Sequence, residues 1–274
     1  AFNGAPLFKA RNDAGQLQPI TARPEVTRGP MGNGLMVLFG TGKYLEPDDK
    51  LLSPQRVNSF YGIVDRGAAV TVASDALRNT VLTKQSILRE VTVNRTAPNG
   101  DTVTSELRIT TDNMLGANQG WYMDLVSPVN GYENEKQVTE AVVRDQRVIF
   151  TTLTPDTDPC GYGGTSWLME LDLRDGSRLE ISPFDLNIDG QFTNEDMVLT
   201  NLNDGNGELP IPPGGIRKKL EGILSRPTIV NGEFGTEGRP VQYKYMPGSS
   251  GNIVVIIENP GADSTGRQSW RQVR

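Results

Sequence analysis

The chain has 274 residues, 36% of them hydrophobic and only 7% aromatic, which is long enough for a folded domain with a real core. Its 33 acidic and 27 basic residues give a formal net charge of −6, which disfavours nucleic acid and anionic membranes as partners and favours cations. The absence of histidine excludes Ser-His-Asp and Cys-His catalysis and His-ligated zinc.

Short runs rich in β-branched residues follow one another along the chain, with turn residues between them. Their spacing predicts an antiparallel meander, with a tight turn at Asp145 and Gln146 inside one of the hairpins. The predicted strands cover residues 34–42, 59–67, 86–96, 102–111, 120–126, 136–153, 166–180, 241–246 and 251–259.

Helical periodicity is scarce. Only residues 74–85 and 212–224 could form helices, and glycines weaken the second candidate. The Pro/Gly-rich stretch 204–215 is the best candidate for a linker. We therefore expect an all-β fold with minor helix, either a sandwich or propeller blades, with roughly four blades' worth of strands. The succession of hairpins favours the propeller.

Residues 185–196, DLNIDGQFTNED, carry the most specific motif in the chain. Oxygen-bearing side chains alternate along the loop and a glycine stands at its sixth position, which is the order of an EF-hand calcium loop. Calcium takes about six to eight oxygen ligands, and the glycine permits the turn that brings the next carbonyl toward the ion. The predicted calcium ligands are Asp185, Asn187, Asp189, the Gln191 carbonyl oxygen and Asp196.

The last position of the loop departs from the EF-hand pattern, because Asp196 replaces the usual, longer glutamate. Pro183 also prevents an ordinary helix from leading into the loop, which is therefore EF-hand-like and not half of an EF-hand pair. An Asx-rich surface turn is the alternative interpretation, since Asp, Asn and Gly are common in turns. Repulsion among three carboxylates predicts that the order of the loop depends on the ion.

Two other short motifs are weaker. GTGK at 40–43 is similar to the end of a phosphate-binding loop, but Val37 replaces the first glycine and Tyr44 follows the lysine, which favours a turn at a strand end. NDGNG at 203–207 lacks carboxylates at the spacing of a metal loop and is interpreted as a turn.

The stretch CGYGGTSWLMELDLRDG at 160–176 resembles a region near the C-terminus of the PilC/PilY family of type IV pilus tip adhesins. Further stretches resemble that family in the same order and together span nearly the whole chain. They are QPITARPEV at 18–26, LMVLFGTGKYLEPDD at 35–49, SFYGIVDRG at 59–67, GWYMDL at 120–125 and GRQSWRQV at 266–273.

The resemblance implies that residues 1–274 form the C-terminal portion of a modified, quinoprotein-like β-propeller in a larger protein. It also implies a calcium-dependent adhesin and pilus biogenesis factor, extracellular at the pilus tip or outer cell surface after export through the periplasm. Pilus extension and retraction, twitching motility, surface attachment and virulence are the implied processes. Minor pilins of the tip and a host or abiotic surface are the implied partners.

Two rival functions follow from other interpretations. A quinoprotein-type dehydrogenase shares the implied fold, but the chain shows no cofactor constellation and no vicinal cysteines, so a non-enzymatic role is expected. A secreted scaffold with a purely structural calcium ion is the second.

Cys160 has no partner for an intrachain disulfide. No apolar run reaches the roughly 18 residues of a membrane helix. The first residues suggest a chain that begins mid-protein or after processing.

Overall fold

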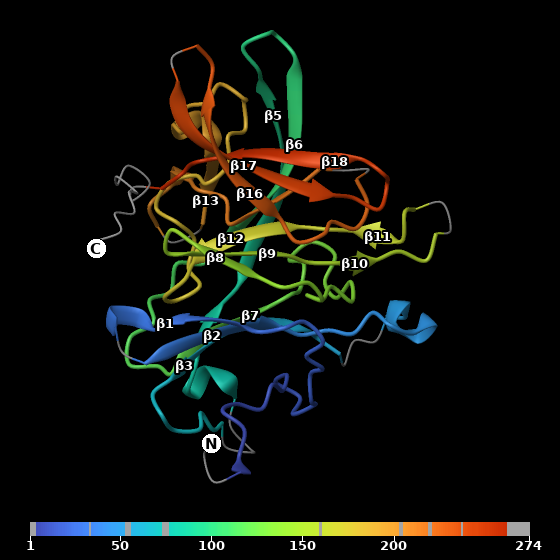
Figure 1. Cartoon of the computed structure of the whole chain (residues 1–274), viewed down its shortest axis with the longest axis vertical. Helices are drawn as coiled ribbons and strands as arrows, with labels where there is room; N and C mark the ends of the chain where they lie inside the picture. Colours follow the sequence, from blue (N-terminus) through green and yellow to red (C-terminus); the bar gives the residue numbers. More distant parts are fainter. Residues whose placement is uncertain are drawn as a thin grey trace, which may run out of the picture.

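The computed structural model describes residues 4–32, 34–52, 56–72, 77–158, 161–202, 205–218, 221–236 and 238–261. Cys160 and the stretch 266–273 lie outside the described residues. The fold is all-β with a few short 3₁₀ turns, as the sequence predicts. Three sheets are stacked along the long axis of the molecule (Figure 1). No helix within the described ranges has the length and apolar character needed to cross a membrane.

The first sheet is formed by the N-terminal part of the chain. Its neighbours pair antiparallel, except that β4 runs parallel to β7. Its strand order is β1 (Glu25–Arg28), β2 (Leu35–Gly40), β3 (Ser59–Asp65), β7 (Gly120–Asp124) and β4 (Thr83–Gln85). The 3₁₀ turns η2 (Pro30–Gly32), η3 (Pro47–Lys50) and η4 (Arg78–Thr80) lie in its connections.

The second sheet occupies the middle of the stack and is antiparallel throughout. Its strand order is β5 (Ile87–Thr96), β6 (Thr102–Thr110), β15 (Gly215–Arg217), β12 (Leu168–Asp172), β9 (Arg147–Thr151) and β8 (Val142–Arg144). The predicted turn between β8 and β9 is present, because Asp145 and Gln146 have φ angles of +49° and +61°.

The third sheet contains β16 (Thr228–Phe234), β17 (Arg239–Pro247) and β18 (Ile253–Glu258). Two small ladders complete the described structure, β10 (Thr154–Pro155) with β11 (Gly164–Thr165) and β13 (Val198–Asn201) with β14 (Glu208–Ile211). The 3₁₀ turn η5 (Asn194–Asp196) precedes β13. The described residues thus form three larger sheets and two small ladders.

Apolar side chains fill the spaces between the sheets. Between the first and second sheets, the rings of Phe60 and Phe150 stack at 3.9 Å, and Trp121 lies 5.7 Å from Phe60. A second cluster joins the second and third sheets and includes Leu168 and Met246, both essentially inaccessible to solvent. Each such side chain contributes roughly 1.5–3 kcal/mol on burial, so stacking the sheets is the main source of stability.

A buried ion pair lies in the second sheet. Arg108 is 0% exposed and donates two hydrogen bonds of 2.6 Å to the carboxylate of Glu135. Its Nε atom donates to Glu90 at 2.9 Å, and its guanidinium lies 4.1 Å from the centre of the Trp167 ring. The charge of Arg108 is therefore fully compensated where water cannot reach it.

A second buried cluster of charges joins the second and third sheets. Lys244 contacts the carboxylates of both Glu170 and Glu258, and all three side chains are at most 1% exposed. Arg147 donates to Glu170 at 2.7 Å. Burial, followed by the charge of Glu170, raises the pKa of Glu258 well above its usual range.

Three local predictions are wrong. The described part of the first helical candidate, 77–85, contains η4 and β4 and not an α-helix, and within 212–224 the chain forms β15, inserted between β6 and β12. The expected linker 204–215 contains β14. Close packing explains why a glycine occurs in β15, because a Cβ atom on Gly215 would lie 2.5 Å from the sulfur of Met169. The insertion of β15 and the parallel β4 also depart from a simple meander.

Candidate metal centre

The predicted calcium loop, 185–196, starts at the edge of the third sheet. Phe184 forms an isolated antiparallel bridge with Glu258, and the amide of Asp185 donates to the carbonyl oxygen of Ile257 at 3.0 Å. Phe184 and Leu186 are buried in the cluster between the second and third sheets. The apolar neighbours of Asp185 thus anchor the start of the loop in the core.

The first half of the loop turns around the carboxylate of Asp185. This carboxylate accepts hydrogen bonds from the amides of Asp189 at 3.2 Å and Gly190 at 2.8 Å. The carboxylate of Asp189 in turn accepts from the amide of Gln191 at 2.7 Å. Ile188 and Gly190 have φ angles of +59° and +71°, so the chain reverses direction sharply between the predicted ligands.

Gly190 is required both by its backbone conformation and by its neighbour. A Cβ atom at this position would lie 2.1 Å from the ring of Phe234 at the end of β16. Arg239, at the start of β17, donates to the carbonyl oxygen of Asp189 at 3.4 Å. The tip of the loop therefore rests on the hairpin that joins β16 and β17.

Asp196 closes the loop from its far end. It is 0% exposed, and its two carboxylate oxygens accept from the amides of Leu186 at 2.7 Å and Thr193 at 2.9 Å. Thr193 caps η5 by accepting from the amide of Glu195 at 3.1 Å. The twelfth position of the loop is thereby held beside its second position.

The amide side chains of the loop make local contacts. Asn187 accepts from the amide of Asp189 at 3.3 Å and donates to the carboxylate of Glu195 at 3.1 Å. The side chain of Gln191 donates to Asp189 at 3.4 Å. Glu195 is not among the ligands predicted from the sequence. Its position directly before Asp196 is the one feature of the sequence that places it near the site.

Negative charge accumulates in the loop. Burial, with the nearby charges of Asp185 and Asp189 added to it, raises the pKa of Asp196 to about 6. Burial also raises the pKa of Asp185, and Asp189 again adds to the effect. These carboxylates are costly to ionise together, so a cation among them would be stabilised.

The donor chemistry fits calcium, but the side chains do not form a ready-made cage. All five predicted ligands offer oxygen atoms, the ligand type that calcium requires. Within the ranges that the structure describes, however, no three His, Cys, Asp or Glu side chains lie close enough together to hold a metal ion. The Asp189 carboxylate accepts from the amide of Gln191 through one oxygen, so acceptor sites remain for an ion. Calcium binding here stays a prediction.

Comparison with known proteins places the chain in a family. A family model described as the PilY1 beta-propeller domain matches residues 1–97. The type IV pilus biogenesis factor PilY1 of Pseudomonas aeruginosa is 30% identical over 283 residues, covering 100% of this chain and 22% of the relative. A homologue from Xylella fastidiosa is 28% identical over 282 residues, covering 99% of this chain and 18% of the relative.

A solved structure agrees with these relatives. The crystal structure of the Pseudomonas aeruginosa PilY1 C-terminal domain matches with a TM-score of 0.69 and 26% identity, covering 95% of this chain and 49% of that chain. The chain belongs to the PilY family. The resemblance seen in the sequence is thus confirmed, and so is an all-β, propeller-like fold. The chain spans about a fifth of the length of the curated relatives, 22% for the Pseudomonas aeruginosa protein.

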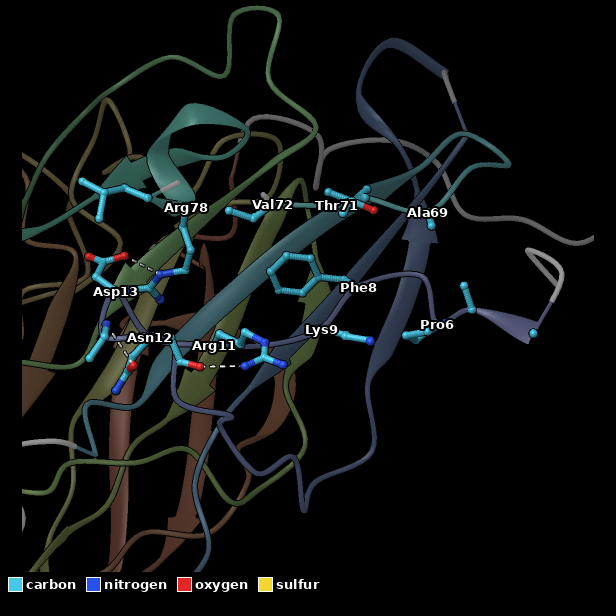
Figure 2. A pocket seen from close by; sticks show the side chains of 16 residues that line it. Pro6, Phe8, Lys9, Arg11, Asn12, Asp13, Ala69, Thr71, Val72 and Arg78 are labelled. Atoms are coloured by element: carbon cyan, nitrogen blue, oxygen red, sulfur yellow. Dashed lines mark hydrogen bonds and ion pairs between the residues drawn. The ribbon is translucent and has the colours of Figure 1, made fainter. Parts of the chain in front are cut away.

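A cavity of about 770 Å³ in this PilY-family chain lies away from the loop, between the N-terminal segment around Phe8 and residues 69–72 (Figure 2). Arg78 lies at one end of it, 3% exposed. Its guanidinium donates to Asp13 at 2.9 Å and to Asp124 at 3.0 Å. Since these bonds join the N-terminal segment to β7, the charge of Arg78 has a structural role: it holds that segment against the first sheet.

Proposed function

We propose that this chain is part of a non-enzymatic type IV pilus biogenesis factor and adhesin at the pilus tip or outer cell surface, reached by export through the periplasm. The observation that carries this proposal is the similarity to PilY1 proteins over 100% of the chain. The structural match over 95% of the chain supports it. Minor pilins of the tip and a host or abiotic surface are the proposed partners.

In this proposal the loop 185–196 holds one calcium ion through Asp185, Asn187, Asp189, Asp196 and the carbonyl oxygen of Gln191. The raised pKa values of Asp185 and Asp196 support it, because burial and the neighbouring carboxylates make ionisation of these groups costly and a bound cation would offset that cost. When bound, calcium supplies that positive charge. The backbone bonds to Asp185 and Asp196 already hold both ends of the loop near each other.

The position of the loop explains how calcium could regulate attachment and the extension and retraction of the pilus. The loop touches β18 through Asp185 and the β16–β17 hairpin through Gly190 and Phe234. A change in the order of the loop would therefore reach the whole third sheet. A regulatory ion requires an affinity close to the ambient calcium concentration, whereas a far tighter site would be purely structural.

The test uses the full-length parent protein in its piliated host. Asp189→Ala is compared with Asp101→Ala, which alters an exposed turn between β5 and β6. We expect surface piliation, twitching and attachment to respond to calcium in the wild type and in Asp101→Ala but not in Asp189→Ala. An unchanged calcium response in Asp189→Ala would contradict the regulatory role.

A further inference from the structure

The GTGK motif at 40–43 packs against residues 136 and 137, beside a cavity that Lys43 and Lys136 line. A Cβ atom on Gly42, whose φ angle is +144°, would lie 2.4 Å from the Cβ atom of Lys136. A Cβ atom on Gly40 would lie 2.3 Å from that of Gln137. The two glycines therefore let residues 136 and 137 pack directly against the end of β2, which brings Lys136 beside Lys43.

The cavity has a volume of about 320 Å³, at the small end of the roughly 300–1,000 Å³ typical of ligand pockets. Lys43, Arg56 and Lys136 line it, together with polar groups such as Asn58. An apolar edge is formed by Leu17 and Leu51. The size suits a ligand about as large as a monosaccharide.

Lys136 brings a buried ammonium group to this cavity. The residue is 2% exposed, and its Nζ atom donates to the carbonyl oxygens of Asp49 at 2.6 Å and Lys43 at 3.2 Å. An ammonium group has three hydrogens, and the third has no hydrogen-bond acceptor among the described residues, the ring of Tyr44 lying 5.7 Å from Nζ. Burial, with the positive charge of Arg56 adding to it, lowers the pKa of Lys136 to about 8.

Arg56 adds a second positive charge to the cavity. Within the described part of the chain, its guanidinium makes no hydrogen bond or ion pair, although its carbonyl oxygen accepts from Tyr132. Lys43, in contrast, pairs with Glu46 at 2.8 Å. The carboxylate of Asp49 also lines the cavity: its Oδ2 atom accepts from the amides of residues 45 and 46, and its Oδ1 atom lies 3.7 Å from Nζ of Lys43.

The cavity also offers an acceptor for a hydroxyl group. Asn58 is 6% exposed and donates through its Nδ2 atom to the carbonyl oxygen of Glu135 at 2.9 Å. Its Oδ1 atom accepts no hydrogen bond from the described residues. Asp48, on η3, is the exposed carboxylate at the rim and would repel an anion.

We propose that this cavity binds a monosaccharide-sized oxyanion, a sugar carboxylate or sugar phosphate, through the ammonium of Lys136 and the guanidinium of Arg56. The Asn58 oxygen receives a hydroxyl group of the same ligand. This site is independent of the calcium loop, because it is lined by residues within 12–19, by Lys43 after β2, by η3 and by the segments before β3 and β8.

The experiment is calorimetric titration of the chain with glucuronate, glucose 6-phosphate and, as the neutral reference, glucose. The main variant is Arg56→Gln, which breaks no described contact of the guanidinium and so leaves the fold intact. Asp48→Asn removes the repelling charge at the rim. Lys50→Gln is the matched control, because Lys50 is an exposed cation on η3 that does not line the cavity.

We expect at least one of the two anions to bind and glucose not to bind detectably. Arg56→Gln should weaken binding about tenfold, as expected for a lost charged hydrogen bond. Asp48→Asn should strengthen it about threefold, and Lys50→Gln should change it by less than about twofold. If only one of the two anions binds, its anionic group, carboxylate or phosphate, is the one that the cavity recognises. Absence of binding by both anions, equal binding of glucose, or unchanged affinity in Arg56→Gln would overturn the proposal.

Discussion

The amide of Asp185 donates a 3.0 Å hydrogen bond to the carbonyl oxygen of Ile257, which ties the first residue of the candidate calcium loop to the last described strand. The next residue on that strand, Glu258, belongs to the buried charge cluster between the second and third sheets. The loop and the third sheet are therefore mechanically linked, and a change in one should be measurable in the other.

Calcium should stabilise the chain against unfolding. At a calcium concentration about 100 times the dissociation constant, the gain in the free energy of unfolding should be about 2.7 kcal/mol. Thermal denaturation with calcium and with excess chelator measures it, and hydrogen exchange should show the gain in residues 183–196 and in β18. Equal stability in both conditions, with no local change in exchange, would argue against a bound ion.

Gly190→Ala should lower the free energy of unfolding by about 1–3 kcal/mol, because an alanine is strained at a φ angle of +71° and would collide with Phe234. The control is Gly15→Ala, at a φ angle of +77° with open space around it, which should cost about 1 kcal/mol or less. Urea denaturation compares them. Similar losses in both variants would mean that the contact with Phe234 is unimportant.

Glu258→Gln should stabilise the chain more at pH 8 than at pH 5. The pKa of Glu258 is raised in the folded state by burial and by Glu170, so the folded chain holds a proton that the unfolded chain has already lost above its ordinary pKa of 4.5. The stability that this proton contributes is present at low pH and is lost as the pH rises through the folded-state pKa. Glutamine resembles the protonated form and avoids that loss.

Urea denaturation of the wild type and Glu258→Gln at both pH values measures this difference. Glu208→Gln is the control, since Glu208 is exposed on β14 and should show no such trend. A variant that is less stable than the wild type by the same amount at pH 5 and pH 8 would show that Glu258 is ionised across this range and held by Lys244.

Arg108→Met should destabilise the chain by about 3–5 kcal/mol, because it leaves the buried carboxylate of Glu135 without its partner. Arg23→Met is the matched control. Its side chain is 66% exposed and pairs with Glu140, so its removal should cost at most about 1 kcal/mol. Chemical denaturation separates the two, and a loss below about 1 kcal/mol in Arg108→Met would show that Glu135 takes up a proton or water.

The sequence predicted the strands whose alternation or β-branched content is strong, such as β2, β3 and β6, because those patterns depend on local burial. It failed where tertiary contacts decide the structure. Gly214 and Gly215 weakened a helical pattern, but only the neighbouring side chains of Thr110 and Met169 show that glycine is needed for a strand there.

The candidate site was predictable to a similar extent. The spacing of Asp185, Asp189 and Gly190 predicted a tight loop, which the structure contains. Spacing could not reveal that Asp196 folds back onto the amide of Leu186, or that Phe234 packs against Gly190, since these contacts depend on the third sheet. The charged cavity at Lys136 was also invisible, because its two main cations are separated by 80 residues in sequence, from 56 to 136.

The central claim is that residues 185–196 hold one calcium ion, and calorimetric titration of calcium into the wild type and Asp189→Ala tests it most directly. Because Asp196 is shorter than glutamate and no paired hand supports the loop, we expect a dissociation constant on the order of 10⁻⁶–10⁻³ M for the wild type. Magnesium should compete poorly, since it requires a tighter octahedral shell. Asp189→Ala should abolish binding while the β-type far-UV circular dichroism stays intact. No calcium binding by the wild type, or unchanged binding by Asp189→Ala, would reduce the loop to an Asx-rich turn.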